Sequence, residues 1–330
     1  MEENKLLLKV KDLKVSFFTP AGEVKAVDGI SYSLGYNEVM GVVGESGSGK
    51  SVEAYSIIGL LQNPGKVIGG SIEFEGEDLL SYTPEQMRQF RGNKVSMIFQ
   101  NPMTCLNPVY TIGNQLTEAL TCHDRTISKE EARRKAIEML ELVGINNAEK
   151  RMNQYPHEFS GGMLQRALIA MALVCNPKLL IADEPTTALD PTIQAQIIQL
   201  LKQIREKMNM GIMYITHDLS VVAQICDRVV VMYAGMVQEI ADVRTLFHDP
   251  RHPYTLGLMQ AMPKMGQNRQ RLYNIDGIVP HITQMPEGCH FAPRCPYATE
   301  ECHATCPGLT EVAPGHFVRC HHHACVKKEE

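Results

Sequence analysis

The sequence lacks any long hydrophobic run, since no stretch approaches the roughly 18 consecutive apolar residues of a membrane-spanning helix. It also lacks a long run of basic residues, and its formal net charge at pH 7 is −5. That charge argues against nucleic acid as the main partner. The first residues, Met-Glu-Glu-Asn-Lys, lack the basic and then apolar layout of a secretory signal. We therefore expect a soluble, cytoplasmic protein.

Cysteine is scarce over most of the chain. Only four of the ten cysteines lie in the first 288 residues, and the other six lie in the last 42. In a reducing compartment such a cluster indicates a metal site before it indicates disulfides. With 330 residues, 44% of them hydrophobic, the chain exceeds one average domain and can bury a large core.

Short apolar runs rich in β-branched residues recur along the chain and predict strands. They are residues 39–43, 95–99, 179–182, 212–216 and 229–232. Nearly continuous apolar strands of this length are typical of a parallel sheet that helices cover on both faces. Residues 114–176 predict helices, including one that starts at a capping box formed by Ser128 and Glu131. The order of strands, helices and strands again predicts an α/β fold.

The character of the sequence changes after about residue 245, where prolines and histidines become frequent and the hydrophobic periodicity fades. We expect residues 245–288 to form a connecting segment and residues 289–325 to form a small lobe held together by metal. No internal repeat is visible.

A glycine-rich stretch follows the first apolar run and precedes a segment with helical spacing. It has the G-x-x-x-x-G-K-[ST] pattern of a phosphate-binding loop. Glycines let consecutive N–H groups curl around phosphates, and the N-terminus of the following helix adds partial positive charge. We expect Lys50 to reach phosphate oxygens and Ser51 to bind Mg²⁺; the alternative is a turn that binds nothing. The residues of the loop are Gly44, Glu45, Ser46, Gly47, Ser48, Gly49, Lys50 and Ser51.

Two carboxylates end the apolar run at residues 179–182. Asp183 and Glu184 are therefore predicted at the carboxyl edge of a strand, where α/β sheets bind their ligands. Beside a phosphate loop, Asp183 would hold Mg²⁺ and Glu184 would act as the general base that polarises the attacking water. The alternative is a pair of solvated acids at a strand end.

Further motifs follow in an order that resembles the ATP-binding cassette (ABC) ATPases. Residues 159–167, Phe-Ser-Gly-Gly-Met-Leu-Gln-Arg-Ala, are similar to the signature motif of that family. Together with the phosphate loop and the acidic pair, these motifs span residues 10–240 in the family's order. The matching positions are Phe17 for the aromatic residue that stacks on adenine, Gln100 for the Q-loop, Ser160, Gly161 and Gly162 for the signature, Ala188-Leu189-Asp190 for the D-loop and His217 for the switch histidine.

The resemblance implies how such residues work together. ATP and Mg²⁺ are the expected ligands, with Gln100 joining Ser51 and Asp183 at the metal and His217 donating to the γ-phosphate. The signature glycines begin a helix, which makes a second anion-binding end. In this family that end faces the phosphate loop of the opposite subunit, so ATP joins two cassettes, and hydrolysis lets them open.

A narrower resemblance is to the oligopeptide/dipeptide and nickel branch of bacterial import ATPases. It rests on residues 98–108, 252–255, 275–280 and 289–295, so it covers nearly the whole chain. Met163 is normal for this branch. Three positions depart from its pattern without removing an ATP ligand: Asn101 replaces an acidic residue, Cys105 a serine and Leu164 a basic residue. Leu164 bears on the contact with the partner subunit.

The resemblance also implies the domain organisation. We expect a phosphate-loop NTPase core with a mostly parallel sheet, a helical subdomain at about residues 101–178 that carries the signature, and a small C-terminal cysteine-rich lobe. The nucleotide-binding domain would span residues 1–245, and the extension of this branch would span residues 246–330.

The clustered cysteines predict a metal centre in the C-terminal lobe. Five residues separate Cys289 from Cys295, six separate Cys295 from Cys302, and Cys320 lies further on. This is not the short spacing of zinc ribbons and fingers. Thiolate-only ligation from a loop favours one 4Fe–4S cluster, which some members of the branch carry, with zinc and no metal as alternatives. We expect Cys306 and Cys325 to be spare thiols and residues 321–323, His-His-His, to be a solvated tract.

These observations predict the ATP-hydrolysing energy subunit of a bacterial importer, most simply for oligopeptides or dipeptides. It would act at the cytoplasmic face of the membrane with a paralogous ATPase subunit, two permease subunits and, indirectly, an extracellular solute-binding protein. No nucleic acid is expected. An importer of nickel or another small solute is the alternative within the branch.

Two further classes of protein fit less well. A soluble ABC ATPase acting on DNA or ribosomes would be expected to carry coiled-coil heptads or a second phosphate loop, and the chain shows neither. A regulatory iron–sulfur sensor would not need hydrolysis geometry, whereas the acidic pair and His217 are intact.

Overall fold

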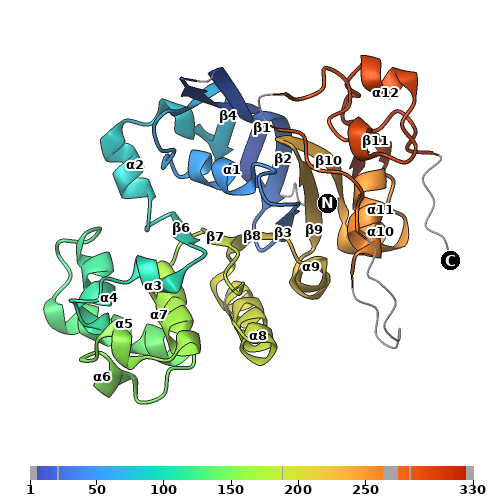
Figure 1. Ribbon diagram of the computed structural model, residues 1–330. Helices are drawn as coiled ribbons and strands as arrows, with labels where there is room; N and C mark the ends of the chain where they lie inside the picture. The colour runs from blue at the N-terminus through green and yellow to red at the C-terminus, as the bar shows by residue number, and fades with distance from the viewer. Residues whose placement is uncertain (1–5, 21, 188, 263–273, 282–283, 325–330) are drawn as a thin grey trace. The chain divides into compact units, whose positions relative to one another are not determined.

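The computed structural model describes residues 6–324 except 21, 188, 263–273 and 282–283. The chain divides into two compact units. Figure 1 labels their helices and strands and colours the chain by residue number. The first unit comprises residues 1–7, 35–37 and 81–213. The second comprises residues 8–34, 38–80 and 214–330.

The second unit contains two sheets and carries the glycine-rich loop. The strands that lie wholly or mostly in this unit are β1 (Leu6–Thr19), β2 (Gly22–Gly35), β3 (Val39–Val43), β4 (Gly65–Phe74), β5 (Glu77–Asp78), β9 (Arg228–Tyr233), β10 (Met236–Asp242), β11 (Thr310–Ala313) and β12 (His316–Val318). Its helices are α1 (Lys50–Ile57), α9 (Leu219–Ile225), α10 (Val243–His248), α11 (Pro253–Gln260) and α12 (Glu300–Ala304), with short 3₁₀ turns η1 (Leu79–Ser81) and η3 (Ala292–Arg294).

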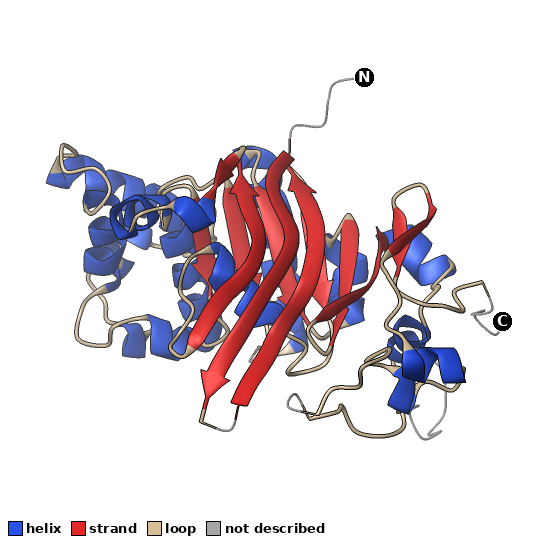
Figure 2. Cartoon of the chain, turned by 90° about the horizontal axis from the view of Figure 1, so that it is seen from above, coloured by secondary structure: helices blue, strands red, loops and turns tan. Residues whose placement is uncertain are grey.

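One sheet of this unit is antiparallel, with the strand order β2-β1-β4-β5. Figure 2 shows its long strands lying side by side. In the other sheet, β3 pairs in parallel with β9, and β10, β12 and β11 then follow as antiparallel strands. All five residues of β3 are buried, as expected for a strand covered on both faces.

The first unit is rich in helices (Figure 1). Its strands β6 (Val95–Ile98) and β7 (Leu179–Asp183) pair in parallel. Strand β8 (Gly211–Thr216) crosses the boundary between the units along the chain. Its helices are α2 (Pro84–Phe90), α3 (Pro102–Cys105), α4 (Ile112–Thr121), α5 (Lys129–Leu142), α6 (Ala148–Arg151), α7 (Gly161–Leu173) and α8 (Pro191–Met208), with a 3₁₀ turn η2 (Pro156–Glu158).

The strands predicted from apolar runs are all present, as β3, β6, β7, β8 and β9, and the α/β fold class is confirmed. The antiparallel sheet of β1, β2 and β4 was not predicted. Residues 245–288 do more than connect, because they include the largely buried helix α11. In the part of the chain that the structure describes, no helix combines the length and apolar character needed to cross a membrane.

Candidate functional site

The glycine-rich loop joins β3 to α1 and needs its glycines for steric reasons. The φ angles of Gly44, Gly47 and Gly49 are 158°, 79° and 98°. A Cβ atom on Gly44 would lie 2.1 Å from the carbonyl oxygen of Met232, and one on Gly49 would lie 2.5 Å from that of Ala26. Both positions therefore exclude any side chain, which keeps the loop backbone close to the sheet.

Lys50, the first residue of α1, directs its ammonium group into the loop. Its Nζ donates to the carbonyl oxygens of Gly44 at 2.7 Å and Glu45 at 2.9 Å. The N-cap residue of α1 is Gly49, which offers no side-chain hydrogen bond to the helix N-terminus. A buried cation and a helix N-terminus without a side-chain cap form an arrangement suited to bind an anion such as phosphate.

The acidic pair lies in the first unit at the end of β7, as its position in the sequence predicted. Asp183 is buried, and Glu184 has a φ of 47°, which is unusual for a residue with a side chain. The Glu184 carboxylate accepts hydrogen bonds from Gln100 Nε2 at 2.8 Å and Thr187 Oγ1 at 3.0 Å. The structure thus brings Gln100 and Glu184 together, although 84 residues separate them.

The signature residues form an open pocket of about 400 Å³ with the D-loop aspartate, also within the first unit. Ser160 caps α7 and accepts from the N–H of Met163, and Asp190 caps α8 and accepts from the N–H groups of Thr192 and Ile193. The N-termini of two helices of 13 and 18 residues therefore line one pocket, together with the side chain of Arg166. Ala188, the first D-loop position, lies outside the described residues.

The remaining predicted residues belong to the second unit. His217 follows β8 and is exposed, just before Asp218 caps α9. Phe17 is half-buried in β1 and pairs with Gly65 of β4, where a Cβ atom would lie 2.7 Å from the Phe17 ring. The phosphate loop, Phe17 and His217 thus lie in one unit, and Gln100, the acidic pair, the signature and Asp190 lie in the other.

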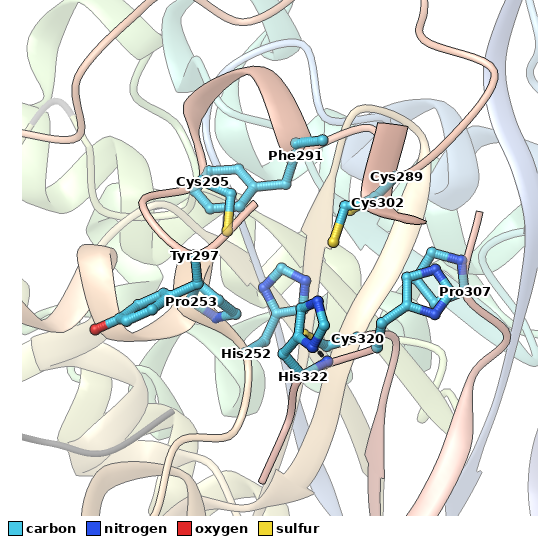
Figure 3. Close-up of a pocket in the computed structure, with 12 residues that line it drawn as sticks. His252, Pro253, Cys289, Phe291, Cys295, Tyr297, Cys302, Pro307, Cys320 and His322 are labelled. Atoms are coloured by element: carbon cyan, nitrogen blue, oxygen red, sulfur yellow. Dashed lines mark hydrogen bonds between the residues drawn. The ribbon is translucent and has the colours of Figure 1, made fainter. Parts of the chain in front are cut away.

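The clustered cysteines do converge in space, as Figure 3 shows for Cys295 and Cys302, whose sulfur atoms point into a common pocket. Cys289 and Cys320 also line this pocket, together with His252. Its volume is only about 10 Å³, which is near the space that one water molecule needs.

The prediction of a 4Fe–4S cluster is nevertheless wrong. Among the residues that the structure describes, no group of three or more His, Cys, Asp or Glu side chains is arranged to hold a metal ion, so the zinc alternative has no ligand set either. Burial raises the pKa of Cys295 to about 11 and that of Cys320 to about 12. Both thiols are therefore protonated at neutral pH in the metal-free protein. The predicted spare thiol Cys306 is exposed, and Cys325 lies outside the described residues.

Contacts to the loop residue Glu45 were not predicted from the sequence. Arg294 and Tyr254, both far along the chain, reach its carboxylate and its backbone N–H. The only signal for them is that each lies in a C-terminal stretch on which the narrower resemblance rests.

Known proteins match this chain over nearly its whole length. Residues 27–187 match the family described as ABC transporter, and residues 238–302 match the oligopeptide/dipeptide transporter C-terminal region. The probable peptide ABC transporter ATP-binding protein y4tR of Sinorhizobium fredii is 51% identical, covering 96% of this chain and 94% of that protein. The dipeptide transport ATP-binding protein DppD of Escherichia coli is 49% identical, covering 96% of each. The oligopeptide transport ATP-binding protein AppD of Bacillus subtilis is 51% identical, covering 95% and 96%.

Solved structures match the fold. The ATP-binding cassette MJ0796, a dimer in a post-hydrolysis state with ADP and phosphate, has a TM-score of 0.65 at 27% identity, covering 72% of this chain and 99% of that one. The protein cbiO1 of Clostridium perfringens, part of the transporter complex cbiONQ, has a TM-score of 0.64 at 27% identity, covering 74% and 91%.

Proposed function

The chain belongs to the ABC transporter family of ATP-binding proteins and is an ATPase of that family, and from this premise we propose that it powers peptide import. The observation that carries the proposal is identity of about half, over 95–96% of the chain, to ATP-binding proteins named for peptide, dipeptide and oligopeptide transport. The second family match, to the oligopeptide/dipeptide C-terminal region, supports the same branch.

In the proposed reaction the phosphate loop and Lys50 bind the β- and γ-phosphates of ATP, and Phe17 stacks on its adenine. The hydroxyl of Ser51, the carboxylate of Asp183 and the amide oxygen of Gln100 are the hard oxygen ligands that Mg²⁺ prefers, so these residues fit the ion. When bound, Mg²⁺ would neutralise charge on the phosphates.

Glu184 is the proposed general base. Its carboxylate oxygen Oε2 accepts hydrogen bonds from Gln100 and Thr187, which hold the group in a defined orientation. A carboxylate held in this way can accept a proton from water as that water attacks the γ-phosphate. His217 would donate a hydrogen bond to the γ-phosphate from the exposed position after β8.

The pocket lined by Ser160, Gly161, Gly162 and Asp190 supports a role in a pair of cassettes. Two helix N-termini meet there, so the pocket is suited to the γ-phosphate of an ATP held by the phosphate loop of a second subunit. We infer that the second subunit is a paralogous ATPase. The relative MJ0796 is a dimer with ADP and phosphate, which supports pairing as such.

The proposed setting is the cytoplasmic face of a bacterial membrane, with two permease subunits and an extracellular solute-binding protein that delivers the peptide. Helices α3–α7, within about residues 101–178, would form the helical subdomain, and the permeases would contact it near Gln100. The functional division at about residue 245, with a cysteine-rich lobe after it, stays a prediction.

The test is peptide-stimulated ATPase activity of the assembled transporter. The chain would be co-purified with the permeases and the paralogous subunit encoded beside its gene, and phosphate release would be measured with and without peptide-loaded binding protein. Stimulation by peptide supports the proposal. Stimulation by a nickel chelate alone would overturn the peptide assignment, and failure to assemble with any permease would overturn the transport function.

A further inference from the structure

The phosphate loop contains one acidic residue, Glu45, and the C-terminal part of the chain contacts it twice. The Glu45 backbone N–H donates to the Tyr254 hydroxyl at 2.9 Å. Its carboxylate pairs with the Arg294 guanidinium, also at 2.9 Å. The exposed fractions of the two side chains are 28% for Glu45 and only 6% for Arg294, so the pair is shielded from water on the arginine side.

Arg294 is itself held in one orientation. It donates from Nε to the carbonyl oxygen of Asp276 at 3.1 Å and from Nη2 to that of Ile275 at 3.2 Å. Its Cζ lies 5.7 Å from the centroid of the Tyr233 ring, within the range of a cation–π contact. The planar fork of an arginine can satisfy all of these contacts and the carboxylate at once, which a lysine cannot do.

Tyr254 belongs to a rigid group of buried rings. The ring centroids of Tyr233 and Tyr254 are 4.8 Å apart, and Phe291 lies 5.3 Å and 5.4 Å from them. All three side chains are at most 1% exposed. Burial raises the pKa of the Tyr254 hydroxyl, which therefore stays neutral and available to the Glu45 N–H. Two separate stretches of the C-terminal region, around residues 254 and 294, thus contact one residue of the loop, and residues 275 and 276 hold Arg294 in place.

The charge of Glu45 would oppose the task of the loop. A loop that binds the anionic phosphates of ATP is weakened by a carboxylate of its own, because like charges repel strongly where water is partly excluded. Lys50 already contacts the carbonyl oxygen of Glu45 at 2.9 Å, so an unrestrained carboxylate on the same residue could also reach the ammonium that phosphate needs. The Arg294 guanidinium neutralises this carboxylate and holds it away from the Lys50 ammonium.

We propose that Arg294 is a positioning residue for nucleotide binding, which neutralises and restrains Glu45 so that the C-terminal region sets the ATP affinity of the phosphate loop. This inference rests on the proposed function only in that the loop binds ATP. It does not depend on which solute is transported or on which subunits assemble.

A double-mutant cycle tests the inference, with the dissociation constant of a fluorescent ATP analogue and the kcat of hydrolysis as separate readouts on the full chain. Arg294→Ala should raise the dissociation constant about fivefold or more, because it leaves the loop with an unpaired carboxylate. Its kcat at saturating ATP should change less than about twofold. Glu45→Gln removes the charge and should bind the analogue at least as tightly as the parent chain.

The decisive result is whether the effect of Arg294→Ala on ATP binding depends on the charge of Glu45. Adding Arg294→Ala to Glu45→Gln should have little further effect, since the arginine then has no charge to neutralise. A merely structural role for Arg294 would weaken binding equally in both backgrounds, and that result would overturn the inference. Arg251→Ala is the matched control, because Arg251 pairs with Asp249 in the same region without touching the loop.

A second variant protects the test against misfolding of Arg294→Ala. Tyr254→Phe keeps the buried ring and removes only the acceptor of the Glu45 N–H, so it should weaken binding about twofold or more with an unchanged thermal unfolding midpoint. An unchanged dissociation constant in both Arg294→Ala and Tyr254→Phe would overturn the inference and leave the proposed function intact. If the parent chain itself bound no ATP analogue, both would fall.

Discussion

Glu184 occupies a backbone conformation that few residues with side chains adopt. Its φ of 47° costs energy of about 1–3 kcal/mol, and such conformations persist where the surroundings impose them. The buried strand β7 ends directly before it, and the hydrogen bonds from Gln100 and Thr187 hold its carboxylate. This combination of local strain and a fixed acidic group makes Glu184 the residue at which we expect hydrolysis to be most sensitive.

Glu184→Gln should lower the kcat of ATP hydrolysis about a hundredfold or more, because the amide cannot accept the proton of the attacking water. The dissociation constant for ATP should stay within about twofold of the parent value, since the substitution preserves side-chain size and an acceptor for Gln100. Steady-state phosphate release and equilibrium nucleotide binding measure the two quantities separately.

Glu149→Gln serves as the control, because Glu149 is exposed on α6 and should leave both quantities unchanged. Hydrolysis at a near-normal rate in Glu184→Gln would show that another group takes the proton.

Residues of the candidate site were predictable where local sequence determines their role. The loop from Gly44 to Ser51 and the pair Asp183–Glu184 are each contiguous, so spacing and the preceding apolar run identify them. Contacts between distant residues leave no such pattern. Arg294 meets Glu45 across 249 positions, and no periodicity or local motif relates an arginine in a 3₁₀ turn to a loop at the other end of the chain.

At the scale of elements, strands buried on both faces were predictable and strands with one polar face were not. All residues of β3, β7 and β8 are buried, and they read as continuous apolar runs. Along β1 and β2 buried positions are interspersed with exposed and half-buried ones, so no continuous apolar run marks them. Helix α11 was missed for a related reason, because a histidine N-cap and Pro253 at its start resemble loop composition.

Helix α1 buries an acidic side chain away from water. Glu53 is fully buried, and within the described residues neither of its carboxyl oxygens has a hydrogen-bonding partner of good geometry. Burial raises the pKa of this carboxyl from 4.5 to about 8, and the neighbouring Tyr32 hydroxyl of β2 lowers it only in part. Glu53 is therefore neutral in the folded protein at neutral pH, while it would ionise in an unfolded chain.

The packing of α1 should consequently lose stability as the pH rises. Between pH 4.5 and about 8 only the unfolded chain releases this proton, so the Glu53 contribution is fully present below the lower value and falls through this window. The slope is at most about 1.4 kcal/mol per pH unit. Glu53→Gln should remove it, so that the variant gains thermal stability over the parent chain as the pH rises.

Thermal unfolding midpoints across this pH range, compared between the parent chain, Glu53→Gln and the exposed Glu149→Gln, measure the effect. A constant difference between the parent chain and Glu53→Gln at every pH would mean that Glu53 carries the same charge in the folded and unfolded states.

At the scale of the whole molecule, cysteine spacing was a poor guide because it does not report the space between side chains. The four cysteines do gather, as a metal centre would require. Yet Phe291, Pro253 and Tyr297 also line the pocket and leave only about 10 Å³. The convergence that the cysteine spacing predicted is therefore a small, closely packed pocket.

In the proposed pair of ATPases, the pocket at Ser160 and Gly162 would contact the ATP bound by the other subunit. One chain alone would therefore form only part of each nucleotide site. A Cβ atom on Gly162 would lie 3.1 Å from Ile193. A larger side chain at Gly162 would therefore either displace Ile193, which lines the pocket, or project into the pocket itself. Gly308 offers a matched position outside the pocket, since a Cβ atom there meets nothing within 4 Å.

With Glu184→Gln to block turnover, ATP and Mg²⁺ should convert the chain into a pair with its paralogous subunit, seen as a doubling of mass in light scattering after size exclusion. The closed state makes contacts that neither subunit makes alone, so binding energy shifts the population toward it. Adding Gly162→Val should weaken this association about tenfold or more, while the matched Gly308→Val should not. Because the ATP held by this chain's own phosphate loop would be unaffected, nucleotide binding by the isolated subunit should persist in both variants. Pair formation that survives Gly162→Val would place the interface away from this pocket and require a different surface to join the two ATPases.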